Sequence, residues 1–263
     1  MAATSPIGFD TERLRAQVLA TYDRVAREPE GAFHFHRGPD YAVEYLKYDR
    51  RELANIPARA TARFAGVGNP HRIGLILPGE TVLDHACGAG MDLLLAALRV
   101  GPRGRAIGVD MTPAMRESAI ASAREAGLSG IVDIRAGVYE ELPVDDASVD
   151  VVISNGVVNL APDKNRVFRE IYRVLRPGGR LYLADVVVAR ELKMEARGNP
   201  DLWAACIGGA LPATELPEIA AAAGLRDGRY SERFDCFRNT SAEAEVSKDL
   251  RVHGANFFAH KHK

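Results

Sequence analysis

The chain has 263 residues, enough for one large α/β domain or for a core domain with an elaborated cap. Its formal net charge is −1 at pH 7, and 26% of its residues are charged, so it offers no electrostatic attraction to nucleic acid or to an anionic membrane. No stretch approaches the roughly 18 consecutive apolar residues that a membrane span needs. We therefore expect neither a nucleic acid nor a membrane as a partner.

The N-terminal residues and the cysteines indicate a cytoplasmic protein. Residues 1–5 lack the basic and apolar regions of a signal peptide. The three cysteines, Cys87, Cys206 and Cys236, are an odd number without the spacing of a zinc site. We expect free thiols in a reducing compartment and no bound metal ion.

The first part of the chain differs in pattern from the rest. The Gly/Asn/Pro cluster at 66–70 is typical of a loop between two units. We predict a helical or loop-rich cap over residues 1–70 and a core domain over residues 71–263. Within the core, we expect strand–helix units at 79–190 and a C-terminal segment at 191–263.

From residue 79 onward, short apolar segments alternate with amphipathic ones, which is typical of parallel strands covered by helices on both faces. The predicted strands are 81–85, 105–110, 131–135, 149–155 and 180–188, and the predicted helices are 92–100, 113–126, 163–175 and 214–223. Two later β-rich segments, 229–237 and 251–260, are predicted to form an antiparallel hairpin at the sheet edge. The predicted fold is an α/β, Rossmann-like, doubly wound and mostly parallel seven-stranded sheet with an N-terminal cap.

The segment from Val82 to Met91 combines a strand, a tight glycine turn and the start of a helix. Gly88 and Gly90 would let a ligand lie against bare backbone amides. The next strand ends in Asp110, where a carboxylate can accept both hydrogen bonds of a ribose diol. A glycine turn also occurs where a helix simply packs closely on a strand. With Asp110 at this spacing, a nucleotide-like ligand is the favoured interpretation.

Four motifs resemble the class I methyltransferases that depend on S-adenosylmethionine (SAM). They are Asp84-x-x-x-Gly88-x-Gly90, Gly-Val-Asp-Met-Thr-Pro at 108–113, Leu-Pro-Val-Asp-Asp-Ala-Ser-Val-Asp at 142–150, and Val-Leu-Arg-Pro-Gly-Gly-Arg at 174–180. The resemblance implies that SAM is the cofactor and S-adenosyl-L-homocysteine (SAH) the product. The cofactor-binding residues that it implies are Asp84, Ala86, Cys87, Gly88, Gly90, Asp110, Met111, Gly137, Val138, Tyr139 and Asn155.

The resemblance also implies a role for each part of this set. The glycine turn would face the methionine part of SAM, Asp110 the ribose, and Met111 the adenine, while Asn155 would lie beside the sulfonium and the acceptor. Two positions depart from the family pattern. Ala86 stands where the first glycine is usual, and Val138 stands where an acidic residue commonly reaches the adenine amino group.

Within this class, segments 79–84, 109–113, 153–164 and 202–212 resemble arsenite methyltransferases. In that family, cysteines from three segments converge on the metalloid, because trivalent arsenic prefers sulfur ligands. Cys206 falls on one of these positions, Gly156 replaces the second, and the N-terminal region contains no cysteine. Cys87 and Cys236 are the other thiols, and a free cysteine is also a common small buried hydrophobe.

We therefore expect methyl transfer to a small-molecule acceptor other than arsenite. One alternative is a metalloid methyltransferase that uses Cys206. Another is a protein that binds SAM or SAH without catalysis. The expected partners are the small-molecule acceptor and a second copy of the chain in a homodimer.

Two histidines in the cap are further candidates for catalysis. If residues 33–36 form an extended strand, His34 and His36 lie on one face and can act as acid and base on an acceptor. The alternative is a half-buried strand or loop in which both meet solvent. His85 either lines the ligand pocket or makes a structural hydrogen bond. With Cys206, His34 and His36 complete the predicted catalytic set.

Tyr41, Tyr45 and Tyr48 follow these histidines at helical spacing. They form either an aromatic lid over the acceptor or packing between the cap and the core.

Overall fold

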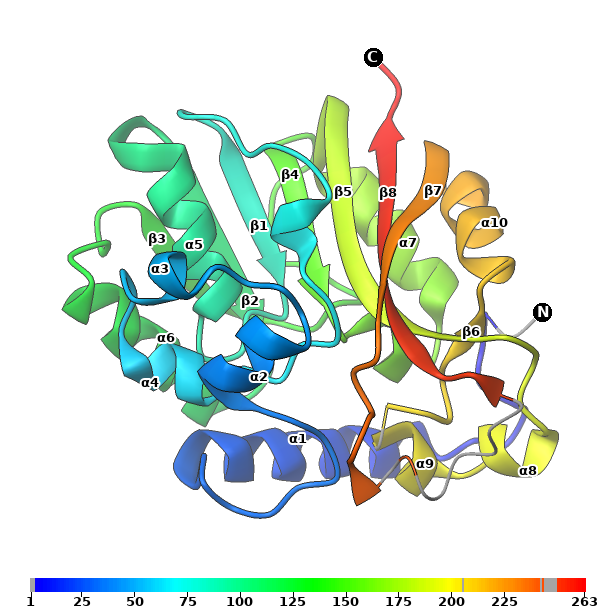
Figure 1. Ribbon diagram of the computed structural model, residues 1–263. Coiled ribbons are helices and arrows are strands. Elements are labelled where there is room, and N and C mark those ends of the chain that lie inside the picture. Colours follow the sequence, from blue (N-terminus) through cyan, green and yellow to red (C-terminus); the bar gives the residue numbers. More distant parts are fainter. Residues whose placement is uncertain (1–2, 205, 242, 244–249) are drawn as a thin grey trace.

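The computed structural model describes residues 3–204, 206–241, 243 and 250–263. Its centre is a mixed sheet with the strand order β3-β2-β1-β4-β5-β8-β7, with the short strand β6 paired to β5 (Figure 1). The strands are β1 Thr81–His85, β2 Arg105–Asp110, β3 Val132–Ala136, β4 Val149–Asn155, β5 Leu175–Val188, β6 Leu211–Pro212, β7 Leu225–Phe234 and β8 His253–Lys261. The first five strands are parallel, and β8 is antiparallel to both β5 and β7. The predicted fold class is confirmed, and β6 is an additional strand.

Helices cover both faces of the sheet because the strands alternate apolar side chains between them. Val82 and Ile153 pack with residues of α5, whereas Leu83 and Leu181 pack with residues of α7 and α10. The helices are α1 Thr11–Arg27, α2 Gly38–Glu44, α3 Arg50–Leu53, α4 Ala58–Ala62, α5 Met91–Val100, α6 Pro113–Glu125, α7 Lys164–Val174, α8 Met194–Arg197, α9 Pro200–Ala204 and α10 Glu215–Ala222, with 3-10 turns η1 Pro70–Arg72, η2 Gly101–Arg103 and η3 Val158–Leu160.

The N-terminal region lies at the carboxyl ends of the parallel strands. Figure 1 shows α1 running below the tips of β1 and β4, with α2 and α4 between α1 and the sheet. The side chain of Asp10 caps α1 by accepting the amide of Arg13 at 2.9 Å. The division into a cap over residues 1–70 and a core over residues 71–263 stays a prediction.

The extended strand considered for residues 33–36 is wrong, because these residues form an irregular connection between α1 and α2. Phe33 is held between two guanidinium groups, with Arg24 4.5 Å and Arg37 4.2 Å from its ring centre. His36 packs instead on the rings of Tyr41 and Tyr45, at 5.0 and 4.9 Å. Side-chain packing, without a neighbouring strand, fixes this segment.

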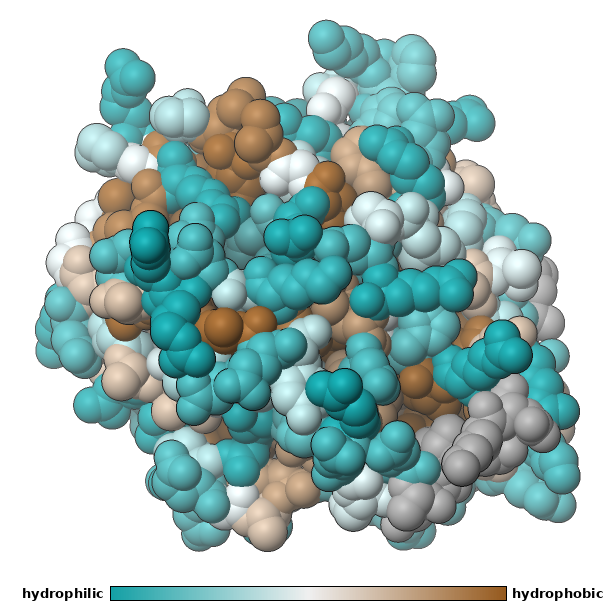
Figure 2. All heavy atoms as spheres, in the orientation of Figure 1, coloured by the Kyte–Doolittle hydropathy of each residue, from teal (hydrophilic) through white to brown (hydrophobic). Residues whose placement is uncertain are grey.

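In the view of Figure 2, most of the surface is hydrophilic, and apolar side chains appear only in small separate groups. Over the part of the chain that the structure describes, no helix combines the length and apolar character needed to cross a membrane.

The loop from Gly66 to Asn69 passes over the carboxyl ends of the parallel strands, where residues of β8 hold it in place. Asn69 and Asn256 exchange hydrogen bonds, since the Asn69 amide donates to Asn256 Oδ1 at 3.1 Å and Asn256 Nδ2 donates to the Asn69 carbonyl at 2.9 Å. Gly254 lies so close to this loop that a Cβ atom built on it would be 1.8 Å from the Val67 carbonyl oxygen. The loop is thus seated directly on the backbone of the last strand.

We expect Gly254→Ala to lower the free energy of unfolding by at least about 2 kcal/mol, because its methyl group would meet backbone atoms that cannot rotate away. Urea unfolding followed by circular dichroism measures this change. Gly130→Ala is the matched control, since a Cβ there meets no atom within 4 Å, and it should change stability by less than about 1 kcal/mol. Equal effects of the two substitutions would contradict this account of the loop.

Candidate functional site

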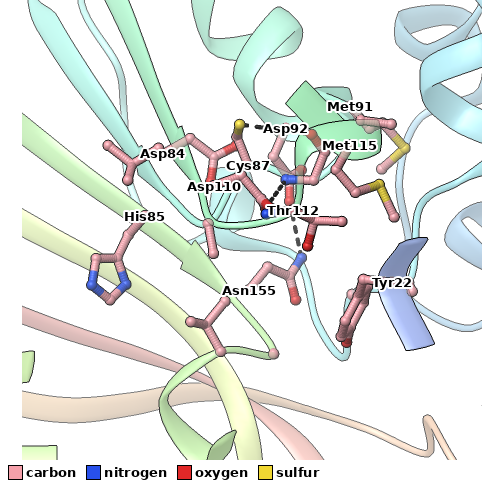
Figure 3. A pocket seen from close by; sticks show the side chains of 18 of the residues that line it. Tyr22, Asp84, His85, Cys87, Met91, Asp92, Asp110, Thr112, Met115 and Asn155 are labelled. Carbon is pink, nitrogen blue, oxygen red and sulfur yellow. Dashed lines mark hydrogen bonds between the residues drawn. The ribbon is translucent and has the colours of Figure 1, made fainter. Parts of the chain in front are cut away.

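A cavity opens where β1, β2 and β4 end and where α1 and the loop after α4 cover them. It contains about 880 Å³ of space, part of it open to solvent. Its walls come from several regions that lie far apart in the sequence. They include Val18 and Tyr22 of α1, residues between 60 and 66, the turn after β1, the ends of β2 and β4, and the loop after β3. Figure 3 shows Tyr22 and His85 on opposite sides of this space.

The turn after β1 is shaped by backbone conformations that favour glycine. Ala86, Gly88 and Gly90 have φ angles of 127°, 53° and 94°. A Cβ atom on Gly88 would meet only the Met115 sulfur, at 4.0 Å, so its place is part of the open cavity. Gly90 lies behind the wall as the N-cap of α5. The turn therefore presents bare backbone to the cavity, as predicted from the sequence.

Asp110 fixes this turn to the end of β2. One of its carboxylate oxygens accepts the Gly88 amide at 2.9 Å and the other accepts the Thr112 amide at 2.8 Å (Figure 3). Burial raises the pKa of the carboxyl group, while these amides lower it. Asp110 also lines the cavity, so the carboxylate that accepts these two backbone amides also borders the cavity.

The cavity is acidic. Asp84, Asp92 and Asp110 all line it, and among the described lining residues Arg63 is the only lysine or arginine. Burial, followed by the charges of Asp92 and Asp110, raises the pKa of Asp84 well above its usual value. Asp84 Oδ2 is buried without a hydrogen-bond partner in the described part of the chain. Positively charged groups on a ligand would relieve both the repulsion and the missing hydrogen bond.

Asn155, at the end of β4, joins the sheet to the cap. Its amide nitrogen donates to Asp92 Oδ2 at 3.0 Å and to the Gly68 carbonyl at 3.0 Å, and its oxygen accepts the Val67 amide at 2.8 Å. Tyr48 completes the group by donating to Asp92 Oδ1 at 2.7 Å. Asn155 lines the cavity as predicted, but protein groups occupy its polar atoms.

The loop after β3 forms another wall. Met111, Gly137 and Tyr139 line the cavity, and so do Ala86 and Cys87 of the glycine turn. Val138 is outside the lining and forms a bridge with Glu141. Of the residues predicted to bind the cofactor, all except Val138 and Gly90 line the cavity.

His85 is buried within the wall and held on both ring nitrogens. Nδ1 is 3.3 Å from Ser154 Oγ and Nε2 is 3.2 Å from the Tyr139 carbonyl oxygen. Burial lowers the pKa of His85 to about 4, so the ring is neutral at pH 7. His85 therefore fits both interpretations considered from the sequence, since it lines the pocket and also makes structural hydrogen bonds.

The other predicted catalytic histidines lie outside the lining of this cavity. His34 borders a separate surface hollow with Arg24 and Ser241. The ring of His36 is 2.7 Å from the Arg238 carbonyl oxygen. The structure does not bring either of them together with the glycine turn, because the loop after α1 turns away from the cavity.

Cys206 is buried and is not among the residues that line the cavity. Its φ of 63° is unusual for a residue other than glycine and indicates local strain. Burial raises the pKa of Cys206 to about 12. Cys87 lines the cavity directly, and Cys236 is buried outside the lining.

Sequence reasoning missed Tyr22, Asp92 and Arg63 as lining residues, and it did not foresee that Tyr48 donates a hydrogen bond to Asp92. Asp92 had a usable signal, since it follows the glycine turn as the second residue of a helix. Tyr22 and Arg63 had none, because they reach the cavity through tertiary packing of α1 and of the loop after α4. Tyr48 connects the N-terminal region to α5 through its bond to Asp92, whereas Tyr41 donates to the Gly66 carbonyl at 2.9 Å within the N-terminal region; neither tyrosine lines the cavity.

Comparisons with known proteins agree with this geometry. Residues 76–224 match a methyltransferase domain family. An arsenite methyltransferase from Halobacterium salinarum is 45% identical over 182 residues, which cover 69% of this chain and 46% of that protein. The arsenite methyltransferase of Homo sapiens is 32% identical over 229 residues, which cover 82% of this chain and 59% of that protein.

A solved structure is similar as well. The crystal structure of an arsenic(III) S-adenosylmethionine methyltransferase from Chlamydomonas reinhardtii matches with a TM-score of 0.70 and 34% identity, over 87% of this chain and 75% of that chain. The chain belongs to the methyltransferase domain family, and its cofactor is SAM. Within the SAM-dependent methyltransferases, it falls in the arsenite methyltransferase-like group. It spans roughly half the length of the curated relatives that it matches.

The cavity fits this cofactor on two structural grounds. SAM carries an ammonium group and a sulfonium group, and the acidic wall with the unpartnered Asp84 oxygen suits such a cation. The missing Cβ of Gly88 leaves room for a ligand against the backbone of the turn. Across the described residues, no group of three or more His, Cys, Asp or Glu side chains is placed to hold a metal ion.

The neutral state of His85 predicts a specific dependence of stability on pH. Between pH 6.5 and about 4 the unfolded chain protonates this histidine while the folded chain does not, so stability falls as the pH falls through that window. We expect wild type to lose up to about 3 kcal/mol more than His85→Gln between pH 7 and pH 4. Denaturant unfolding of both proteins at several pH values measures the difference. Parallel curves would show that His85 is not held neutral by the fold.

Proposed function

We propose that this methyltransferase acts on trivalent arsenic bound through thiols, with Cys206 as the protein's own thiol ligand. The observation that carries the proposal is Cys206 itself, a buried thiol at a position where the family resemblance implies an arsenic ligand, in a strained backbone conformation. Non-glycine residues with such conformations cluster at functional sites. The similarity to arsenite methyltransferases supports the same acceptor.

The expectation of a different acceptor depended on Gly156. A Cβ atom there would lie 3.5 Å from a Val67 methyl group, which is ordinary contact, but the φ of 75° favours glycine. Soluble thiols can supply sulfur ligands that the chain lacks, since arsenic exchanges thiolates readily. One protein thiol then suffices to direct the complex toward the cavity.

Binding arsenic requires Cys206 to release its proton. Because burial raises the pKa of this thiol to about 12, it keeps its proton at neutral pH. When a glutathione-bound arsenic exchanges ligands, an As–S bond to Cys206 would form, one As–S bond to glutathione would break, and the Cys206 proton would leave on the released glutathione thiol. Bound SAM would supply an electrophilic methyl group and would leave as SAH. The protein's part is to align the acceptor with that methyl group and to exclude water.

We propose that SAM is held as the family resemblance implies. Asp110 would receive the ribose hydroxyl groups, and Asp84 and the backbone of the glycine turn would receive the methionine part. Two of the predicted residues, Val138 and Gly90, would act only by shaping the wall, because neither lines the cavity. Asn155 would act through Asp92 and the loop above it.

A second candidate is methyl transfer to a carbon, oxygen, nitrogen or sulfur atom of another small molecule. The replacement of a cysteine by Gly156 and the lack of cysteine before residue 87 favour it. In that case Cys206 would be a structural thiol, and its substitution would leave turnover unchanged.

We expect Asp110→Asn to weaken SAH binding about ten- to hundredfold, since hydrogen bonds to a charged group contribute more than neutral ones. Isothermal titration calorimetry gives this affinity. Asp133→Asn is the control on the neighbouring strand β3, where Asp133 pairs with Arg105 and Arg135 outside the cavity, and it should leave the affinity within about twofold. An unchanged affinity in Asp110→Asn would remove Asp110 from the proposed site.

Methyl transfer from labelled SAM to arsenite with excess glutathione tests the proposed acceptor. We expect methylated arsenic from wild type and at least a tenfold lower rate from Cys206→Ser, with SAH affinity unchanged in both. Cys236→Ser is the matched control, because it removes another buried thiol that is outside the cavity lining. SAH binding without an arsenic product would reject this acceptor and favour the second candidate. Turnover that survives in Cys206→Ser would reject Cys206 as the ligand.

A further inference from the structure

Lys164, the first residue of α7, is a completely buried lysine outside the lining of the cofactor cavity. A lysine is rarely buried in this way unless neighbouring groups compensate its charge. Its Nζ donates to the Ala161 carbonyl at 3.0 Å and lies 4.4 Å from the centre of the Trp203 ring. The amino group therefore joins the end of the η3 turn to helix α9 through one hydrogen bond and one cation–π contact.

Residues 157–161, which include the η3 turn, form a wall segment of the cofactor cavity. Val157 and Leu160 line the cavity directly. The Tyr139 hydroxyl group, from the loop after β3, donates to the Leu160 carbonyl at 3.3 Å. Because Tyr139 also lines the cavity, a shift of the wall segment would change the shape of the space proposed for SAM.

A second ionisable side chain, Asp185 of β5, holds the same wall segment. Lys164 and Asp185 border a separate small cavity with about 200 Å³ of space. Asp185 is buried and accepts the Val158 amide at 2.7 Å and the Asn159 side-chain amide at 2.8 Å. The η3 turn is thus held by Asp185 at its start and by Lys164 at its end, through hydrogen bonds that are costly to lose in a buried place.

The Trp203 ring, the other partner of Lys164, has a fixed position. The ring is buried, and its Nε1 donates to the Arg197 carbonyl at 2.8 Å. A Cβ atom on Gly209 would be 1.8 Å from the Asn159 carbonyl oxygen, so the turn after α9 packs directly on the backbone of η3. The Lys164 amino group therefore lies where the wall segment and the region of α9 meet.

We propose that Lys164 is a positioning residue for the cofactor cavity. Its charged amino group holds the wall segment against Trp203, and loss of that charge releases the segment and weakens the binding of SAM and SAH. An ammonium group donates a stronger hydrogen bond to a carbonyl than a neutral amine does, and only the ammonium group makes a cation–π contact. The inference concerns the cofactor alone and does not depend on which acceptor is methylated.

The charge of Lys164 changes near neutral pH. Burial lowers the pKa of its amino group to about 7, while the charge of Asp185 raises it. Among the other charged groups that face it, Arg197 lowers this pKa, and Asp163 and Glu215 raise it. The cation–π contact should therefore be formed at pH 6 and lost at pH 9.

Trp203 is the only tryptophan of the chain, so its fluorescence reports on this contact directly. We expect wild-type fluorescence to change in one step centred near pH 7, and Lys164→Met, which removes the amine and keeps an unbranched side chain, to lack that step. Lys261→Met is the matched control, because Lys261 lies 4.2 Å from the Tyr172 ring and outside the cavity lining. It should keep the wild-type step.

Calorimetric titration with SAH tests the link to the cavity. From pH 6 to pH 9, the SAH affinity of wild type should fall about three- to tenfold more than that of Lys164→Met. Because linkage between two bound species is reciprocal, saturating SAH should raise the midpoint of the Trp203 step by about 0.5 to 1 pH unit. Lys261→Met should match wild type in both measurements.

Stability should change in the opposite direction. Since the pKa of Lys164 in the fold is below its usual value of 10.5, the unfolded chain binds more protons between the two values. The stability of wild type relative to Lys164→Met should therefore rise above pH 7, while its SAH affinity falls. A residue that only stabilised the fold would change both quantities in the same direction, and thermal unfolding of the two proteins distinguishes these cases.

A fluorescence step that is absent from wild type, or that persists in Lys164→Met, would reject the contact between the charged amine and Trp203. A step whose midpoint stays the same in saturating SAH would reject the positioning role. This wild-type experiment is decisive even if Lys164→Met does not fold. None of these measurements contains arsenite, so a failure of the proposed acceptor is recognised separately.

Discussion

The side chain of Asn155 is where the sheet, the glycine turn and the cap meet. It bonds to Asp92 of α5 and to both Val67 and Gly68 of the loop above, and Tyr48 bonds to the same Asp92. Asp92 and Tyr48 are buried and Asn155 is half-buried, so these groups depend largely on one another for their hydrogen bonds. This one group therefore joins the end of β4, helix α5 and the loop from Gly66 to Asn69, which border the cavity, and holds them in fixed relative positions.

Burial decides the charge state of the cavity as much as composition does. The carboxyl groups of Asp84 and Asp110 have raised pKa values, His85 stays neutral, and the Tyr22 hydroxyl keeps its proton. The result is a wall of acids and neutral donors that favours a cationic ligand. The same burial makes the nearby Cys206 a protonated thiol that only a soft electrophile or metalloid would displace.

Much of the core could be predicted from the sequence because it is local. The strand ending in His85, the glycine turn and Asp110 lie where the pattern places them. The fifth strand begins at Leu175, not at residue 180, because its Pro-Gly-Gly segment forms an irregularity within the strand, with Gly178 at a φ of 81°, and does not end the pairing with β4. The contribution of Tyr22 to the cavity could not be predicted. Tyr22 lines the cavity only because α1 packs on α9, and no periodicity in the sequence indicates which helices pack together.

The loop that roofs the cavity is locked by Gly254 and Asn256 of the last strand, almost two hundred residues after the loop itself. During synthesis on the ribosome, the sheet strands β1 to β5 emerge long before the residues that fix this roof. The cap segment therefore cannot reach its final state before β8 has been synthesised. A chain truncated before β8 would lack the contacts that fix this roof.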